Sequence, residues 1–298
     1  MTQATLATAP FTMADTRPSD RRDLAALRGF YAGRQAFILG NGRSLSNLTG
    51  SQLLALGAPG RVTFGCNFIT RWDRLAHTPS RVPCGCYRYD HLSFVPTFYC
   101  ASESDMTWDI ADGAAGLPRE TTKLYSHAYL DGTRLADWIR QHSPGGELYE
   151  GAQFRPWVTD WVWLYRRPYF PSKGLPLARM DGEPLANGTL HPVDGGLMDG
   201  RDYLSSAGSV VLDCALQVAV WAGCREIYLL GVDATQEGHV YDRGGDRVKL
   251  HEESRLAMIR SLDLWYRELD TRGIKVRSLS PGGNLTVPKV DVKEILGA

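Results

Sequence analysis

A turn of small and polar residues, GNGRS, follows a short apolar run near the start of the chain. Gly40 and Gly42 allow the backbone to approach a phosphate group closely, and the side chain of Asn41 offers both a donor and an acceptor. Ser44 follows where a short helix can begin. The turn lacks the third glycine of a dinucleotide fingerprint and the lysine of a Walker loop. It therefore predicts either a phosphate-binding loop of another kind or a structural tight turn.

Polar side chains at two other predicted element ends could join the same site. Asn67 follows an apolar strand, where its amide could bind a ribose, a phosphate or a sugar, or cap the strand. The stretch 205–209 opens a long helix and contains Ser206, Gly208 and Ser209. Free backbone amides and hydroxyls at the positive end of a helix suit an anion. Helix capping accounts for one of these serines, but not readily for the whole cluster.

A third group of residues could transfer a proton. Asp233 ends a predicted strand, where carboxylates commonly meet a ligand or fix a loop. His239 and His251 titrate near neutral pH, so either could take a proton from a hydroxyl group, or lie exposed in solvent. Tyr241 could donate a hydrogen bond to a departing phosphate, or pack against the protein. This segment is therefore a candidate for the reacting part of the site.

Strands and helices alternate along the chain, which predicts an α/β fold with a Rossmann-like, doubly wound, mostly parallel sheet. Ligands of such sheets bind beyond the carboxyl ends of the strands, where the candidate residues fall. A short helix is expected to begin with Ser44 or Ser46 as its cap. The other expected helices are 21–31, 52–56, 205–222 and 252–272, and the expected strands are 35–39, 61–67, 84–89, 95–100, 225–233 and 274–281.

Changes in composition divide the chain into parts. We expect residues 1–20 to form a flexible tail, residues 21–100 and 203–298 to form the α/β domain, and residues 101–202 to be an insertion. The insertion is rich in Gly, Pro and Trp, and long segments at the carboxyl end of a sheet often grip a ligand. It predicts either a substrate lid or an irregular excursion with a small core of its own.

Charge and cysteine content argue against several functions. The 33 basic and 33 acidic residues balance, so we expect no stable binding of nucleic acid or of a membrane. The longest apolar stretch contains charged residues, and residues 1–20 lack a secretory signal, which favours a cytoplasmic protein with reduced thiols. Cys84, Cys86 and His91 lack the paired spacing of a zinc site, so we expect neither a metal nor a cofactor.

The order of four motifs resembles that of the glycosyltransferase family 42 sialyltransferases. The motifs are FILGNGRSL, VTFGCN, SAGS before a long helix, and REIYLLGVDATQEGHVY. The sequence also resembles the wider MptE-like group, formerly domain of unknown function 115, and its C-terminal part is closer to that group. The resemblance covers residues 35–66 and 205–298 and implies a single-Rossmann variant of the GT-A type.

The sialyltransferase pattern implies a nucleotide site. By motif, Asn41, Asn67 and either Ser206 or Gly208 match the positions that bind the cytidine nucleotide in that family. The full set of residues that we expect to bind a nucleotide is Gly40, Asn41, Gly42, Ser44, Asn67, Ser206, Gly208, Ser209 and Asp233.

The same resemblance implies catalytic roles. Tyr241 matches the second of two tyrosines that hold the donor phosphate, whereas Thr235 stands at the position of the first. His251 is the best match to the catalytic base because it precedes the last long helix, and His239 remains the other candidate. The resembling sialyltransferases need no metal, because hydroxyl groups stabilise the departing phosphate.

The implied function is an inverting, metal-independent glycosyltransferase. It would move a sugar from a nucleotide-sugar donor, such as a CMP-linked sugar, to a hydroxyl group of a glycan, a protein or another acceptor. Two alternatives stay open: an MptE-like enzyme that transfers diphosphate from ATP and Mg²⁺ to a pterin alcohol, and a non-catalytic nucleotide-binding protein. Assembly into a homo-oligomer also stays open.

Overall fold

The computed structural model describes residues 27–67, 69, 80–81, 87–88, 95–101, 121–126, 162–165, 209–240 and 252–298. Its strands are β1 (Gln35–Leu39), β2 (Arg61–Cys66), β3 (Ser80–Arg81), β4 (Tyr87–Arg88), β5 (Phe98–Ala101), β6 (Thr122–Ser126), β7 (Val162–Tyr165), β8 (Glu226–Leu230) and β9 (Lys275–Ser278). Its helices are η4 (Arg43–Asn47), α1 (Gly50–Leu56), η8 (Val211–Leu216), α4 (Gln217–Trp221), α5 (Glu252–Thr271) and α6 (Val292–Leu296).

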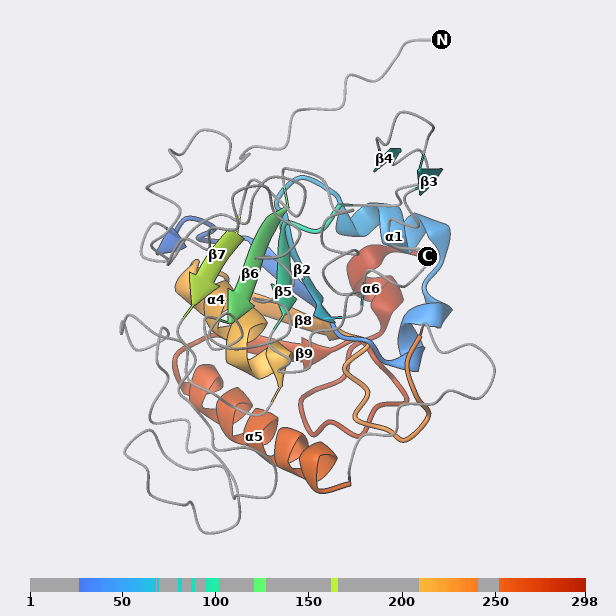
Figure 1. Ribbon diagram of the computed structural model, residues 1–298. Coiled ribbons are helices and arrows are strands. Elements are labelled where there is room, and N and C mark those ends of the chain that lie inside the picture. The colour runs from blue at the N-terminus through green and yellow to red at the C-terminus, as the bar shows by residue number, and fades with distance from the viewer. Residues whose placement is uncertain are drawn as a thin grey trace, which may run out of the picture.

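A seven-stranded parallel sheet organises the protein, in the order β7-β6-β5-β2-β1-β8-β9 (Figure 1). From β1 the sheet grows through β2, β5, β6 and β7 on one side, while β8 and β9 extend it on the other. This order confirms the predicted Rossmann-like sheet. The connections of β1 and β8 diverge at a topological switch point, and ligands of open α/β sheets bind at the carboxyl ends of the strands beside such a point.

Strand β1 is buried on both faces, as expected of a parallel strand with a continuous apolar run. On one face, Ala36 and Ile38 join a core with η8, α4 and α5. On the other face, the rings of Phe37 and Tyr228 stack with their centroids 5.1 Å apart. In Figure 1, α4 and α5 lie on one side of the sheet, and α1 and α6 lie on the other.

The C-terminal segment is fastened to α1 and to the start of β2. The guanidinium of Arg61 lies 5.2 Å from the centre of the Phe37 ring and donates hydrogen bonds to the carbonyls of Ala55 and Ile295. The side chain of Gln52 donates to the carbonyl of Gly297 at 2.9 Å. These contacts cover the second face of the sheet and leave its carboxyl edge to the connecting loops.

Several predicted boundaries are confirmed. Strand β1 spans the predicted residues 35–39, and α5 begins at the predicted residue, Glu252. Gly223 and Gly273 follow α4 and α5 with φ angles of 92° and 71°, a conformation that favours glycine at a helix end. Residues 225–233 were expected to form one strand, but β8 ends at Leu230 because the chain turns at Gly231, where φ is 63°.

Other predictions were wrong in detail. In the described part of the helix expected over 21–31, Leu27 has a 3-10 conformation and residues 28–31 form turns, with bonds such as Phe30 N–H to the carbonyl of Leu27 at 3.0 Å. Neither Ser44 nor Ser46 caps a helix: η4 has no side-chain cap, and Thr49 caps α1 through a capping box with Gln52. Ser44 instead bonds to Asp233, a contact that spacing along the chain does not reveal.

Strands from the middle of the chain extend the main sheet. Both β6 and β7 lie within the region 101–202 that we expected to be an insertion, and they pair in parallel beyond β5. The proposed division of the chain and the lid stay predictions, because most of that region lies outside the described residues. Among the described helices, none is long and apolar enough to cross a membrane.

Candidate functional site

The carboxyl ends of β1 and β8 meet through their backbones. Gly40 donates to the carbonyl of Leu230 at 2.8 Å, and Gly42 donates to that of Gly231 at 2.6 Å. A Cβ atom on Gly40 would lie 2.5 Å from the oxygen of Gly231, and one on Gly42 would lie 2.4 Å from a carboxylate oxygen of Asp233. Both glycines of the GNG turn are therefore needed so that two loops can pack at the switch point.

Asp233 fastens the turn that follows β1. Its carboxylate accepts from the backbone N–H of Ser44 at 2.8 Å and from the Ser44 hydroxyl at 2.5 Å. A carboxylate only accepts, so the Ser44 hydroxyl donates to Asp233 and accepts from Ser280, whose oxygen lies 2.9 Å away. The Ser280 oxygen in turn accepts from Gly231 N–H at 3.1 Å. This chain of hydrogen bonds fixes the loops after β1, β8 and β9 to one another.

The segment after β8 folds back over the GNG turn. His239 pairs with Gly42 in an antiparallel bridge, and Val240 N–H donates to the carbonyl of Asn41 at 2.9 Å. The side-chain oxygen of Asn41 is buried and has no hydrogen-bond partner among the described residues. A buried acceptor without a partner is costly and calls for an explanation, such as a bound water or ion or a functional role. Asn41 is therefore a candidate binding residue.

Asn67 lies at the end of the neighbouring strand. The pairing of Leu39 with Gly65 brings Asn41 and Asn67 each two residues beyond a paired position. Asn67 is 6% exposed and has a left-handed φ of 45°, and its carbonyl accepts from the hydroxyl of Tyr99. Non-glycine residues in this conformation cluster at ligand sites and tight turns.

The helix before β8 begins at the same edge of the sheet. Its C-terminal carbonyls, at Trp221 and Ala222, accept from the segment that precedes β1, so its N-terminus points to the carboxyl edge. Near that N-terminus, Cys214 lies beside Cys100 of β5, and its proximity, together with burial, raises the pKa of Cys100. The helix is widened into a π-helix over Val211–Leu216, a form often found at functional sites.

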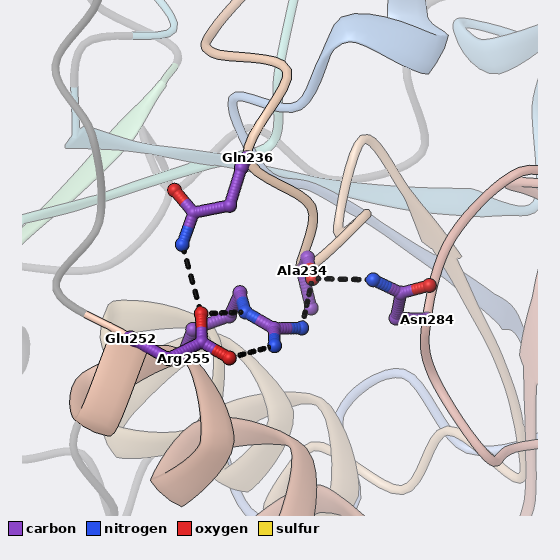
Figure 2. Close-up of polar contacts among 5 residues, drawn as sticks. All are labelled: Ala234, Gln236, Glu252, Arg255 and Asn284. Atoms are coloured by element: carbon purple, nitrogen blue, oxygen red, sulfur yellow. Dashed lines mark hydrogen bonds and ion pairs between the residues drawn. The ribbon is translucent and has the colours of Figure 1, made fainter.

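A polar network that the sequence analysis missed joins α5 to the loop after β8 (Figure 2). Arg255 donates to both carboxylate oxygens of Glu252 and to the carbonyl of Ala234, which Asn284 also contacts. Gln236 donates to Glu252 at 2.9 Å. The hydrogen bonds from Arg255 and Gln236 lower the pKa of Glu252 to about 2. Charge spacing on the predicted helix could have suggested the Glu252–Arg255 pair, but not its contact with Ala234.

The structure thus brings together a subset of the predicted site residues. Those joined at the switch point are Gly40, Asn41, Gly42, Ser44, Asp233 and His239, and Asn67 and Ser209 lie at the ends of elements on the same edge. Ser206, Gly208, Tyr241 and His251 lie outside the described residues, so their predicted roles stay predictions.

The described residues contain no cluster of side chains that could hold a metal ion. Among these residues, no group of three or more His, Cys, Asp or Glu side chains could hold a metal ion, and Cys84, Cys86 and His91 lie outside them. Cys214 and Cys224 are buried free thiols, as predicted from their apolar surroundings. Burial raises the pKa of Cys66 and Cys100, which keeps both thiols protonated.

Comparison with known proteins gives one distant structural similarity. No protein-family model matches the chain, and no curated protein matches it in sequence. Among solved structures, it is similar to the sialyltransferase CstII from Campylobacter jejuni, in complex with a substrate analogue, cytidine-5'-monophosphate. The TM-score is 0.41, with 16% identity over 88% of this chain and 86% of that chain. Similarity at this level assigns neither an activity nor a ligand.

Proposed function

We propose that this protein is a glycosyltransferase that binds a nucleotide-sugar donor at the switch point between β1 and β8. The observation that carries the proposal is the buried Asn41 oxygen, which has no partner among the described residues and lies in the GNG turn at the carboxyl edge of the sheet. Ligands of doubly wound sheets bind at this edge. The order of the motifs in the sequence, which resembles that of the family 42 sialyltransferases, supports a nucleotide sugar as the ligand.

Within this proposal, the described residues have two kinds of role. Ser44 and Asp233 are already bonded to each other, so they set the shape of the turn. Asn41 and Asn67 supply polar groups to the nucleotide, and backbone amides at the start of the helix before β8 supply donors to its phosphate. The sugar then lies toward the segment after β8, which contains His239.

The proposed reaction is a single displacement. The acceptor hydroxyl oxygen forms a bond to the anomeric carbon of the sugar as the bond between that carbon and the donor phosphate oxygen breaks. The acceptor proton passes to His251, or to His239 as the other candidate, and the nucleotide leaves with the bonding electron pair. Tyr241 and the helix amides stabilise the charge on the departing phosphate.

A nucleotide screen by thermal unfolding tests the proposal. A ligand at about 100 times its Kd adds about 2.7 kcal/mol to stability, so CMP, UMP or their sugar conjugates at millimolar concentration should raise the Tm. Cytidine and uridine without phosphate are the matched controls and should raise it less. A ligand that stabilises the protein then enters a transfer assay with hydroxyl acceptors.

The same screen separates the alternatives. Stabilisation by ATP with Mg²⁺ and indifference to CMP and UMP would instead favour diphosphate transfer to a pterin alcohol. Nucleotide binding without turnover on any acceptor would favour a non-catalytic protein. Where turnover is seen, unchanged rates in both His251→Ala and His239→Ala would exclude a histidine as the base. No stabilisation by any nucleotide would overturn the proposal.

A further inference from the structure

The loop after β8 is held in an unusual backbone conformation at Ala234. This residue has a φ of 51°, in the left-handed region that non-glycine residues rarely adopt. Its side chain is buried, with 5% exposed. Such a conformation persists only where surrounding contacts fix it.

Two side chains from different elements fix the carbonyl of Ala234 (Figure 2). Arg255 Nη1, from α5, donates to it at 3.0 Å, and Asn284 Nδ2, from the segment after β9, donates at 3.2 Å. The backbone N–H of Asn284 also donates to the carbonyl of Asp233 at 2.8 Å. The peptide groups that follow Asp233 are therefore held from two sides.

Arg255 is itself fixed by a second set of contacts. Its Nε donates to Glu252 at 2.8 Å, and the same carboxylate accepts from Gln236 at 2.9 Å. The side chain of Arg255 is 14% exposed, whereas that of Glu252 is 56% exposed. A planar guanidinium can donate in several directions at once, which a lysine ammonium on a flexible stem does less well. Arg255 contacts Ala234 directly and Gln236 through Glu252, so the pair links α5 to both ends of the segment from Ala234 to Gln236.

We propose that Arg255 is a positioning residue, which holds the segment 231–240 in the conformation that completes the switch-point site. That segment contains Asp233, which fastens Ser44, and His239, which pairs with Gly42. Loss of the Arg255 contact would leave Asn284 as the one remaining side-chain donor described for the Ala234 carbonyl and would loosen both contacts to the GNG turn. The position of the segment is independent of the ligand, and only the effect on nucleotide binding rests on the proposed function.

Hydrogen exchange of the full-length protein tests this role. Arg255→Gln should speed amide exchange in 231–240 and 40–45 at least tenfold and leave the middle of β8 unchanged. Arg267→Gln is the matched control, because Arg267 lies on the same helix, is 72% exposed and pairs only with Asp263 among the ion pairs described for it. Arg255→Lys should restore part of the protection. If Arg255 merely stabilised the first turn of α5, faster exchange would be confined to α5, and the proposal would be overturned.

Asn284 provides a second variant in case Arg255→Gln fails to fold. Asn284→Ala should have a smaller effect than Arg255→Gln, because Arg255 still holds the carbonyl and, through Glu252, the rest of the segment. Because two donors share one carbonyl, the double variant should speed exchange by more than the product of the two single effects. If the double variant speeds exchange only by the product of the two single effects, Arg255 and Asn284 do not hold the Ala234 carbonyl jointly.

Nucleotide binding gives a separate readout. If CMP stabilises the wild-type protein, its Kd should rise about tenfold in Arg255→Gln, recover in part in Arg255→Lys and stay unchanged in Arg267→Gln. An unchanged Kd in Arg255→Gln would overturn the positioning role. If CMP does not bind the wild-type protein, the proposed function fails, and the exchange measurements still decide whether Arg255 holds the segment.

Discussion

Gly42 lies where the loops after β1 and β8 come closest. A Cβ atom there would fall 2.4 Å from an oxygen of the Asp233 side chain and 2.6 Å from the carbonyl of Gly231. Neither neighbour can retreat freely, because Asp233 is bonded to Ser44, and Gly231 accepts from Gly42 itself. The absence of a side chain at Gly42 is therefore a packing requirement of the switch point.

Gly42→Ala should destabilise the protein and weaken nucleotide binding. Forced overpacking costs about 1–3 kcal/mol, and here it would also push the GNG turn away from Asp233. Urea unfolding measures the free energy, and the nucleotide screen measures binding. Gly50→Ala is the control: Gly50 is the first residue of α1, and apart from its chain neighbours and the backbone of that helix no atom lies within 4 Å of a Cβ there, so its stability should change little. Equal stability of the two variants would contradict the packing argument.

Asn41→Ala should separate binding from stability. Removing a buried acceptor that lacks a described partner removes a desolvation cost, so the free energy of unfolding should stay the same or rise. Loss of one ligand hydrogen bond should weaken nucleotide binding by about 1.4 kcal/mol, or about tenfold. Isothermal titration and urea unfolding of the same preparation measure both quantities. A stable variant with unchanged nucleotide affinity would show that Asn41 does not bind the ligand.

At the scale of elements, the start of α5 is tied to the loop after β8 through Glu252. Arg255 and Gln236 donate to this carboxylate and lower its pKa from the ordinary value of 4.5 to about 2. A carboxyl group whose pKa is lower in the folded state stabilises the protein above its unfolded pKa. Its contribution should therefore be complete above about pH 4.5 and be lost as the pH falls through about 2.

Comparison of the wild-type protein with Glu252→Gln checks this pH dependence. The wild type should be the more stable of the two at pH 7, and the difference should shrink between pH 4.5 and 2. Urea unfolding over this range gives the two free energies. Because Glu252 is exposed, the difference should also fall in high salt. A difference that grows on acidification would contradict the assigned contacts.

At the scale of the whole molecule, one buried layer joins the two halves of the sheet. Leu229 on β8 is fully buried and belongs to the core formed with the helix before β8 and with α5. Strand β8 pairs with both β1 and β9, so this buried layer packs against the strands that carry the switch point. The core around Leu229 therefore contributes to the stability of the whole sheet, of which the switch point is one part.

Leu229→Ala should lower global stability without a specific effect on the loops. Truncation of a buried leucine costs about 2–5 kcal/mol, which thermal or urea unfolding detects readily. Leu54→Ala is the matched control, since Leu54 on α1 is 64% exposed and its truncation should change stability by less than about 0.5 kcal/mol. Similar losses in both variants would argue against the described core.

Local patterns in the sequence were enough to predict the fold class and several elements. The apolar run of β1, the period of α5 and the glycines after α4 and α5 are all signals carried by neighbouring residues. The carboxyl-edge rule then predicted that the GNG turn and Asp233 meet. The α-helix expected over 21–31 is replaced by turns at 28–31, because periodicity alone does not exclude a series of turns.

Contacts between distant residues were decided only by the tertiary structure. Ser44 looked like a helix cap, but its hydroxyl bonds to Asp233, 189 positions away. Arg255 was not singled out from the sequence, and besides its ion pair with Glu252 on α5 it holds the carbonyl of Ala234. The sequence alone determined which residues could bond and which strands could form. The meeting of the loops after β1, β8 and β9 depends on strand order, which is set by packing of the whole core and not by any local pattern.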